Sequence, residues 1–315
     1  MVAITNKYRF PDSYYHRVLK IFSSYSRGHA DYSVTDLKKP VRQLHLTRKN
    51  SDKIIKDCSE LTSAFFGSIG HDLLQSSTKS GMTEKRFYTN FDGVILSGQI
   101  DWLQHNYDDP YTVDLLDYKF TSVWSAKFPD TEKEWEAQLN PYKLLLERNG
   151  YKVVHLYIFA FFRDWKRRDF KKDKGGKYPA KDAKLYRIKV WKQEQTEEYI
   201  KERIKILEEN KYKEEKDLPL CTPDEQWRRG ETWAVVTEQG GRALSGGVCS
   251  SREDAISVAR SDYSNIKNIG VEHRRSEAVR CLDYCDAKEF CSQFKEESEL
   301  GQSIFKPLTK KEKEK

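Results

Sequence analysis

The tripeptide Asp117-Tyr118-Lys119 constrains the fold of this chain more tightly than any other feature. It ends an alternating run, 112–119, that predicts a strand. Because side chains alternate across a strand, Asp117 and Lys119 point to one face and Tyr118 points to the other. A carboxylate and an ammonium group buried together rarely recover the cost of leaving water. The pattern therefore indicates a face that is kept charged for a bound ion.

A second carboxylate comes from the strand just before. Residues 84–103 predict a hairpin with a tight turn at Asp92-Gly93, and Asp101 lies near its end. Carboxylates on neighbouring strands offer the hard oxygen ligands that Mg²⁺ prefers, and a lysine beside them offsets negative charge. We expect Glu84, at the start of the hairpin, near the same polar face. Metal-dependent phosphodiester hydrolysis requires such a combination.

The segment 51–76 predicts a helix that begins at Ser51 or Asp52. Gly67 and Gly70 inside it each cost about 1 kcal/mol relative to alanine, and close approach to a sheet would offset that cost. Such an approach would also bring His71 near whatever the sheet displays. A lone helix histidine is more often a core or surface residue than a ligand, and that alternative stays open. The expected core face consists of Leu61, Phe65, Ile69 and Leu73.

The segment 131–149 predicts a second helix, kinked at Pro141. Gln138 and Tyr142 lie one turn apart on its buried side, where polar groups need partners in the protein or in a bound strand. The alternative is a solvated Gln138 and an ordinary core tyrosine. Residues 153–162 follow as a nearly continuous apolar strand, typical of a central position buried on both faces.

The most basic stretch of the chain, 163–181, carries the aromatic residues Trp165 and Phe170 between its charges. Basic side chains beside aromatic rings suit single-stranded nucleic acid, whereas a solvated loop is the alternative. The hydroxyl groups of Thr121 and Ser122 are candidates for phosphate contacts, with ordinary turn chemistry as the alternative. The expected backbone contacts from the basic stretch are Arg163, Lys166, Arg167 and Arg168.

The C-terminal third begins a different pattern. After an edge strand at 184–192 and a helix at 196–210, the sequence predicts a strand at 232–237, a turn at 239–242, a second strand and a helix at 251–262.

Three cysteines then fall within eleven residues, with one more upstream. Four thiolates suit an iron–sulfur cluster or Zn²⁺. The spacing differs from the Cys-x₂-Cys of zinc sites and favours a cluster, with scattered reduced thiols as the alternative. These residues are Cys221, Cys281, Cys285 and Cys291.

Composition limits the cellular setting. The chain has 315 residues, 37% of them hydrophobic and 33% charged, which predicts a globular protein of one large domain or of a domain with an appendage. Its first 17 residues lack the apolar region of a secretory signal, and its longest apolar run is too short to span a bilayer. We therefore expect no membrane association and a cytoplasmic, bacterial or phage-encoded protein. Its net charge of +7 permits nucleic-acid binding.

Four motifs in order resemble those of the PD-(D/E)XK nuclease superfamily, in particular its RecB-like exonuclease branch and phage-encoded members. Each motif is weak alone, but the series on helix, strand, strand and helix is specific. The resemblance covers about residues 40–165 and extends to the C-terminus through the cysteines. The cysteine pattern departs from the family, which more often has x₂ then x₅ spacing and a distant cysteine upstream of the motif histidine. The motifs are His71, Gly98-x-x-Asp101, Asp117-Tyr118-Lys119 and Gln138-x₃-Tyr142.

The resemblance implies an α/β fold, with a central mixed β-sheet flanked by helices and a small C-terminal appendage of β-hairpin, helix and cysteine cluster. The expected division is an N-terminal segment at 1–50, a nuclease core at 51–215, the appendage at 216–300 and a charged tail at 301–315. In chemical terms it implies a Mg²⁺- or Mn²⁺-dependent DNA exonuclease acting in recombination or DNA processing. Its substrate would be DNA with free ends, including single strands, and a recombination protein its partner.

The family also implies roles for individual residues. Asp101, Asp117 and Lys119 would be catalytic, and Gln138 and Tyr142 would hold the DNA or orient Lys119. The four cysteines would bind a [4Fe–4S] cluster, with Zn²⁺ as the alternative. Two other functions remain open: a restriction-type or CRISPR-adaptation-type endonuclease, and a non-catalytic DNA-binding subunit of a recombination complex. The implied metal ligands are His71, Asp101, Asp117 and the backbone carbonyl of Tyr118.

Overall fold

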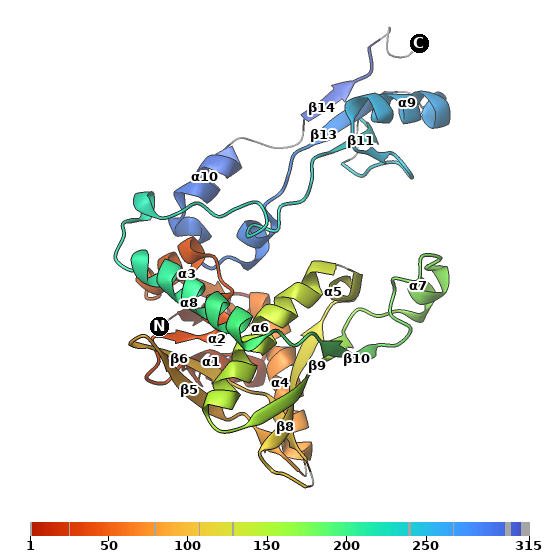
Figure 1. The fold of residues 1–315 in the computed structure, drawn as a ribbon. Coiled ribbons are helices and arrows are strands. Elements are labelled where there is room, and N and C mark those ends of the chain that lie inside the picture. Colours follow the sequence, from red (N-terminus) through yellow and green to blue (C-terminus); the bar gives the residue numbers. More distant parts are fainter. Residues whose placement is uncertain are drawn as a thin grey trace. The chain divides into compact units, whose positions relative to one another are not determined.

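The computed structural model describes residues 2–24, 26–78, 80–106, 108–127, 129–238, 241–266, 268–299 and 304–309. They form a mixed α/β structure with several sheets (Figure 1). The chain divides into a first unit, Met1–Lys39 with Ser51–Tyr212, and a second unit, Pro40–Asn50 with Lys213–Lys315. This division differs from the expected one, because the first 39 residues join the core and residues 40–50 join the C-terminal part.

The central sheet of the first unit has five strands in the order β10-β9-β8-β7-β4. The pair β8–β9 is parallel and the other pairs are antiparallel, so the sheet is mixed, as predicted. β9 is central, but its residues are buried in alternation and Val154 is exposed, so the prediction of burial on both faces was wrong. The strands are β4 (Met82–Thr83), β7 (Trp102–His105), β8 (Thr112–Thr121), β9 (Lys152–Phe162) and β10 (Ala183–Ile188).

A three-stranded sheet in the first unit joins β2 (Tyr32–Ser33), β6 (Val94–Gln99) and β5 (Arg86–Phe91). β5 and β6 form the predicted hairpin, and Asp92 and Gly93 have the positive φ angles, 51° and 93°, of its two-residue turn. The chain leaves this sheet after Gln99 and enters the central sheet at Trp102. The predicted second strand of the hairpin is therefore two strands, and Asp101 lies at the break.

Helix α6 (Pro129–Arg148) packs against the central sheet next to β9. Its apolar residues Trp135, Leu139, Leu145 and Leu146 are all buried. Pro141 lies inside the helix, as expected. The neighbouring helix α8 (Gln193–Glu209) begins three residues earlier than predicted and also packs against α6.

Helix α4 (Thr62–Ser77) begins eleven residues after the predicted start. The preceding residues form strand β3 (Ile55–Asp57), which pairs in parallel with β1 (Ala3–Thr5). The Asp57 carboxylate accepts a hydrogen bond from the N–H of Lys7, just after β1, and another from the N–H of Ser59, which caps the short 3₁₀ helix Cys58–Leu61 before α4. The predicted core face was also wrong at its end, because Leu73 is exposed.

The second unit contains a four-stranded antiparallel sheet, β12-β11-β13-β14, covered by α9 (Arg252–Tyr263). The strand predicted at 232–237 and the helix predicted at 251–262 are confirmed, whereas β13 was missed. β14 lies in the segment predicted as a charged tail. Residues 239 and 240 of the predicted turn, and 301–303 and 310–315 of the tail, lie outside the described residues. The strands are β11 (Thr232–Thr237), β12 (Val248–Cys249), β13 (Ile269–Arg274) and β14 (Ile304–Pro307).

Two helices of the second unit frame the cysteines: α3 (Val41–Lys49) and α10 (Ser292–Glu299). Leu46 of α3 packs in a small apolar core with Leu218, Ala287 and Cys291, which explains why residues 40–50 belong to this unit. Within the described part of the chain, no helix is both long and apolar enough to cross a lipid bilayer.

Candidate active site

The pairing of β7 with β8 brings two carboxylates to one place. Trp102 pairs with Leu116, so the preceding residue, Asp101, falls opposite Asp117. The backbone N–H of Tyr118 donates a 2.8 Å hydrogen bond to Oδ2 of Asp101 and thereby fixes that side chain. The juxtaposition of Asp101 and Asp117, predicted from strand alternation, is therefore present, although Asp101 lies just outside the strand.

Helix α4 approaches the same region through a glycine. A Cβ atom added at Gly70 would lie 2.0 Å from Cζ of Phe120 on β8, so only glycine fits there. A Cβ atom added at Gly67 would have no other atom within 4 Å. The predicted close approach to the sheet is therefore confirmed at Gly70 and wrong at Gly67. It places the ring of His71 beside the rings of Tyr118 and Phe120.

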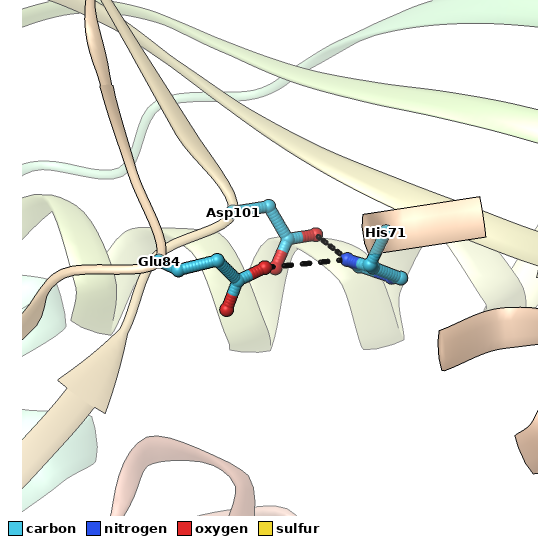
Figure 2. Close-up of side chains that lie close together, drawn as sticks. All are labelled: His71, Glu84 and Asp101. Atoms are coloured by element: carbon cyan, nitrogen blue, oxygen red, sulfur yellow. Dashed lines mark ion pairs between the residues drawn. The ribbon is translucent and has the colours of Figure 1, made fainter. Parts of the chain in front are cut away.

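Three potential metal ligands converge at this point. Nδ1 of His71 lies 3.7 Å from Oε1 of Glu84 and 3.6 Å from Oδ2 of Asp101. Figure 2 shows the imidazole and the two carboxylates pointing toward one another. All three donor atoms lie within 4.8 Å of one another, and no other set of three His, Cys, Asp or Glu donors in the described residues is that compact.

Glu84 owes its place to backbone contacts around the break between the two sheets. Its N–H donates to the carbonyl of Asp101, and Ile100 donates in return to Lys85. Gln99 donates to the Glu84 carboxylate from the adjacent strand. Glu84 also has a positive φ of 52°, an unusual conformation for a residue with a side chain. Several contacts therefore hold this carboxylate beside Asp101.

The donor set fits a small, hard cation. Mg²⁺ binds oxygen at 2.0–2.1 Å in an octahedron, which puts neighbouring ligand atoms about 3.0 Å apart. The observed separations of 3.6 and 3.7 Å exceed this by less than 1 Å. Carboxylates suit Mg²⁺ and Mn²⁺, and an imidazole is common among first-row transition metals. His71, Glu84 and Asp101 would hold such an ion.

Asp117 has a different set of contacts. Its Oδ2 lies 2.7 Å from Nζ of Lys119, and its Oδ1 accepts a 2.9 Å hydrogen bond from Gln138. The Asp117 side chain is 9% exposed and that of Lys119 is 27% exposed, so the ammonium group reaches the open side of the pair. Asp117 is not part of the compact donor set, in which Glu84 stands instead.

The crowding of these charges shifts their pKa values. Burial, together with the negative charge of Asp117, raises the pKa of Asp101 to about 7, although His71, Lys119 and the Tyr118 N–H oppose the rise. Burial alone would lower the pKa of His71, but Glu84 and Asp101 outweigh it and raise that pKa. Burial would likewise lower the pKa of Lys119, but Asp117 and Asp101 raise it, so Lys119 is a cation.

Gln138 and Tyr142 both point inward from α6, and each is 7% exposed. The alternative of a solvated Gln138 is therefore wrong. Gln138 also accepts from Lys38, so the amide links that lysine to Asp117 and orients Asp117 rather than Lys119. Tyr142 packs over Gly98, where an added Cβ would lie 2.5 Å from its ring. This burial leaves both residues little surface for a DNA strand.

The residues expected to contact phosphate differ from one another in their hydrogen-bond partners. The hydroxyl of Ser122 donates to Asp164, as expected of turn chemistry. Thr121 ends β8, and its carbonyl accepts from the N–H of Arg163. The side chain of Arg163 donates to Ser63, and that of Arg168 to Asp169. Arg163, Lys166, Arg167 and Arg168 are all exposed.

The four cysteines of the second unit line one pocket, as their grouping in the sequence predicted. The pocket holds about 20 Å³ of free space, room for one water-sized sphere. Burial, with the neighbouring acids and thiols, raises the pKa of Cys221 to about 12 and that of Cys281 to about 11. No three of these sulfur atoms lie within 4.8 Å of one another. The remaining cysteines, Cys58 and Cys249, lie outside the pocket.

Arg42 on α3 is the most deeply buried charge beside this pocket, with 2% exposure. Its Nε donates to Sγ of Cys291 at 3.3 Å, and its other nitrogens contact Ser292, the Glu215 carboxylate and the carbonyls of 215 and 218. The bond from Nε holds the Cys291 side chain against α3. No local pattern in the sequence connects Arg42 with the cysteines.

Glu84, by contrast, was within reach of sequence reasoning. The Asp92-Gly93 turn fixes the hairpin register, in which Phe91 pairs with Val94 and Arg86 with Gln99. The same register continued by two residues places Glu84 opposite Asp101. A two-residue turn therefore carries enough information to add Glu84 to the ligand set.

No protein-family model and no curated protein sequence matches this chain. Among solved structures, one described as "Crystal structure of SSO0001" is similar with a TM-score of 0.42 and 18% sequence identity. The match covers 61% of this chain and 84% of that one. A similarity at this level identifies neither a family nor an activity.

Proposed function

We propose that the first unit is a Mg²⁺- or Mn²⁺-dependent deoxyribonuclease of the PD-(D/E)XK type, most similar to RecB-like exonucleases. The observation that carries this proposal is the convergence of His71, Glu84 and Asp101 beside the Asp117–Lys119 pair. These residues come from a helix, a sheet break and a central strand. Structural packing alone gives no reason to gather three carboxylates, an imidazole and an ammonium group at one point.

Each residue has a distinct task in the proposed reaction. A bound Mg²⁺ or Mn²⁺ supplies Lewis-acid charge and a water of lowered pKa. His71, Glu84 and Asp101 hold the ion, and Asp117 completes the negative face beside it. Lys119 remains protonated, so it stabilises negative charge on the phosphate instead of accepting a proton. Gln138 keeps Asp117 in place through its hydrogen bond to Oδ1.

The basic segment 163–181 supports a polyanionic substrate. It has nine basic residues against three acidic ones, so its net charge of +6 accounts for most of the +7 of the chain. Chains that neutralise phosphates with such segments bind nucleic acid with strong salt dependence. A DNA exonuclease is therefore the preferred function, with an endonuclease as the alternative that shares the same site.

A digestion of end-labelled linear and closed circular DNA tests the proposal. We expect the protein to degrade linear DNA with Mg²⁺ or Mn²⁺ and not with EDTA, and to leave circles intact. Asp101→Asn removes a proposed ligand and should abolish digestion. Asp114→Asn is the matched control, since Asp114 lies on β8 but pairs with His155. Cleavage of circles would assign an endonuclease, whereas DNA binding without metal-dependent cleavage would overturn the proposed activity.

For the second unit, we propose that Cys221, Cys281, Cys285 and Cys291 bind a metal group, an iron–sulfur cluster rather than Zn²⁺. Tetrahedral Zn²⁺ with Zn–S bonds of 2.3 Å needs sulfur atoms roughly 3.8 Å apart. No three of the thiols lie within 4.8 Å of one another, and the free space between them is small, so either group requires side chains to turn. A brown protein with visible absorption would support the cluster, and a colourless, zinc-loaded protein would contradict it.

A further inference from the structure

A pocket of about 410 Å³ lies beyond the C-terminal end of β8, outside the candidate active site. It is formed by α5 (Trp124–Lys127) and by the segment that follows β9, including α7 (Arg167–Lys172). Its wall is aromatic and charged. The lining residues are Val123, Trp124, Lys127, Asp164, Lys166, Asp169, Lys172, Asp173 and Tyr178.

Two aromatic rings and one lysine make the core of this pocket. Nζ of Lys127 lies 5.3 Å from the centre of the Trp124 ring and 5.0 Å from that of Tyr178. Trp124 is 62% exposed, which is unusual for the largest side chain in proteins. The arrangement offers a largely exposed indole with an ammonium group over its ring, and proteins combine such aromatic and cationic groups to stack a base and neutralise its phosphate.

The acidic residues of the pocket are already satisfied by the protein. Asp164 accepts from the Ser122 hydroxyl and the Val123 N–H, both at 2.7 Å, and these bonds hold the turn that presents Trp124. Asp173 accepts from the N–H of Tyr178, and Asp169 from Arg168. By contrast, Lys127, Lys166 and Lys172 form no ion pair within the described residues. The three lysines and three aspartates of the lining balance in net charge, but the carboxylates are bonded within the protein and the ammonium groups are left for an external anion.

The segment that forms the pocket wall is folded by specific contacts. The indole N–H of Trp165 donates to the carbonyl of Pro179, and the N–H of Lys166 donates to the Tyr178 hydroxyl. These bonds close the two ends of the segment onto each other and hold the Tyr178 ring in place. The alternative of an unstructured solvated loop does not fit this arrangement.

The distance between Trp124 and the candidate active site is short enough for one nucleic-acid strand to contact both. Trp124 follows Lys119 by five residues, so the two Cα atoms are at most about 18 Å apart. A stacked nucleic-acid strand advances about 3.4 Å per nucleotide, so a chain that passes Lys119 reaches Trp124 within about five nucleotides.

We propose that Trp124, Tyr178 and Lys127 form a stacking site for an unpaired base of single-stranded DNA, a few nucleotides from the point of cleavage. The proposal rests on the proposed function in taking DNA as the substrate. It adds that the bound part of that substrate is unpaired, because a base inside a duplex has no free face for Trp124. The lysines of the pocket then contact the adjoining phosphates.

Fluorescence anisotropy with a labelled oligothymidylate tests this site in EDTA, where no cleavage occurs. Trp124→Ala should weaken binding by about 5- to 150-fold, the range for loss of one stacked base, and Trp124→Phe should restore most of it. Lys127→Met should reduce the slope of log affinity against log salt by about 0.7. Binding of blunt duplex DNA should change less than twofold in all three variants.

Tyr212→Ala is the matched control, because Tyr212 is 87% exposed and has Lys211 near its ring but lines no part of the pocket. It should bind like the wild type. Trp124→Ala binding within twofold of the wild type, or losing duplex and single-strand binding equally, would overturn the stacking site. Wild-type protein that binds single strands yet never cleaves DNA would overturn the proposed activity and leave the stacking site intact.

Discussion

The His71–Glu84–Asp101 set of the first unit and the four cysteines of the second unit are assembled in different ways. The first set is fixed by backbone structure, since sheet register aligns Asp101 with Asp117 and a glycine contact seats the helix that carries His71. Its three donor atoms lie within 4.8 Å. The thiols come from short turns and loops, and no three of them are that close.

The two sets therefore differ in how much of the site is formed before its ligand binds. Donors on paired strands and a packed helix hold their geometry without an ion, whereas donors on turns depend on the metal to complete their fold. We therefore expect the first set to exchange its ion readily and the cysteine pocket to keep its metal group as part of its structure.

The largest expected effect is the loss of the metal group from the cysteine pocket. Thiolate-bound structural metals contribute on the order of 10 kcal/mol. Metal should therefore copurify with the wild-type protein, survive dialysis against EDTA, and disappear in Cys281→Ser. Elemental analysis and visible absorption measure this. Cys249→Ser is the control, since Cys249 lies on β12 outside the pocket, and an equal loss there would remove the distinction between the two groups of thiols.

Replacement of Arg42 tests what holds the cysteine pocket together. Arg42→Met leaves Glu215 and two carbonyl groups without their donor. We expect a loss of about 3 kcal/mol, at the low end for a buried ion pair because Glu215 is partly exposed. Hydrogen exchange of the α3 and α10 amides measures the change. Lys49→Met, which breaks the exposed Lys49–Glu214 pair on the same helix, should cost at most about 1 kcal/mol. Equal effects would contradict the role of Arg42.

The glycine pair on α4 tests the backbone assembly of the first site. Gly70→Ala forces the helix away from Phe120, so we expect about 1–3 kcal/mol of destabilisation and weaker Mn²⁺ binding through His71. Gly67→Ala meets no atom and should stabilise the helix by up to about 1 kcal/mol. Urea denaturation measures the stability of both variants, and Mn²⁺ titration measures their affinity for the ion. Opposite signs are expected, and matching signs would show that close packing at Gly70 is not required.

The protein without metal should also show a pH-dependent free energy of unfolding. In the folded protein Asp101 has a pKa of about 7, above its ordinary 3.8, so between these values the folded state holds a proton that the unfolded state has lost. Stability should therefore fall as pH rises from about 4 to 7, and the raised pKa of His71 adds a loss of the same sign above 6.5. Mn²⁺ binding competes with these protons, so it should raise the thermal midpoint more at pH 8 than at pH 5.5. Asp101→Asn should flatten the slope.

Much of the first site was predictable from the sequence because its geometry follows from local periodicity. Strand alternation predicted that Asp117 and Lys119 share a face, and helix spacing predicted the inward side of Gln138 and Tyr142. The break at Ile100–Asp101 was not predictable, because the residues on both sides favour strands and only tertiary pairing moves the chain from one sheet to the other.

Contacts between distant segments account for the remaining differences. Asp57 is the N-cap of the short 3₁₀ helix Cys58–Leu61, and its second bond, from the N–H of Lys7, comes from a segment 50 positions earlier. Arg42 meets Cys291 across 249 positions in the sequence, and no local pattern signals such a pair. The cysteine spacing predicted which thiols gather, although not the distances between them.

Replacement of Lys119 separates metal binding from cleavage at the first site. Lys119 contacts Asp117 but is not among the three compact donors, so Lys119→Met should still bind Mn²⁺. Its cleavage of end-labelled linear DNA should fall by about 100-fold or more, the usual effect of removing one charge that stabilises a transition state. Full cleavage by Lys119→Met at saturating Mn²⁺ would contradict the proposed active site.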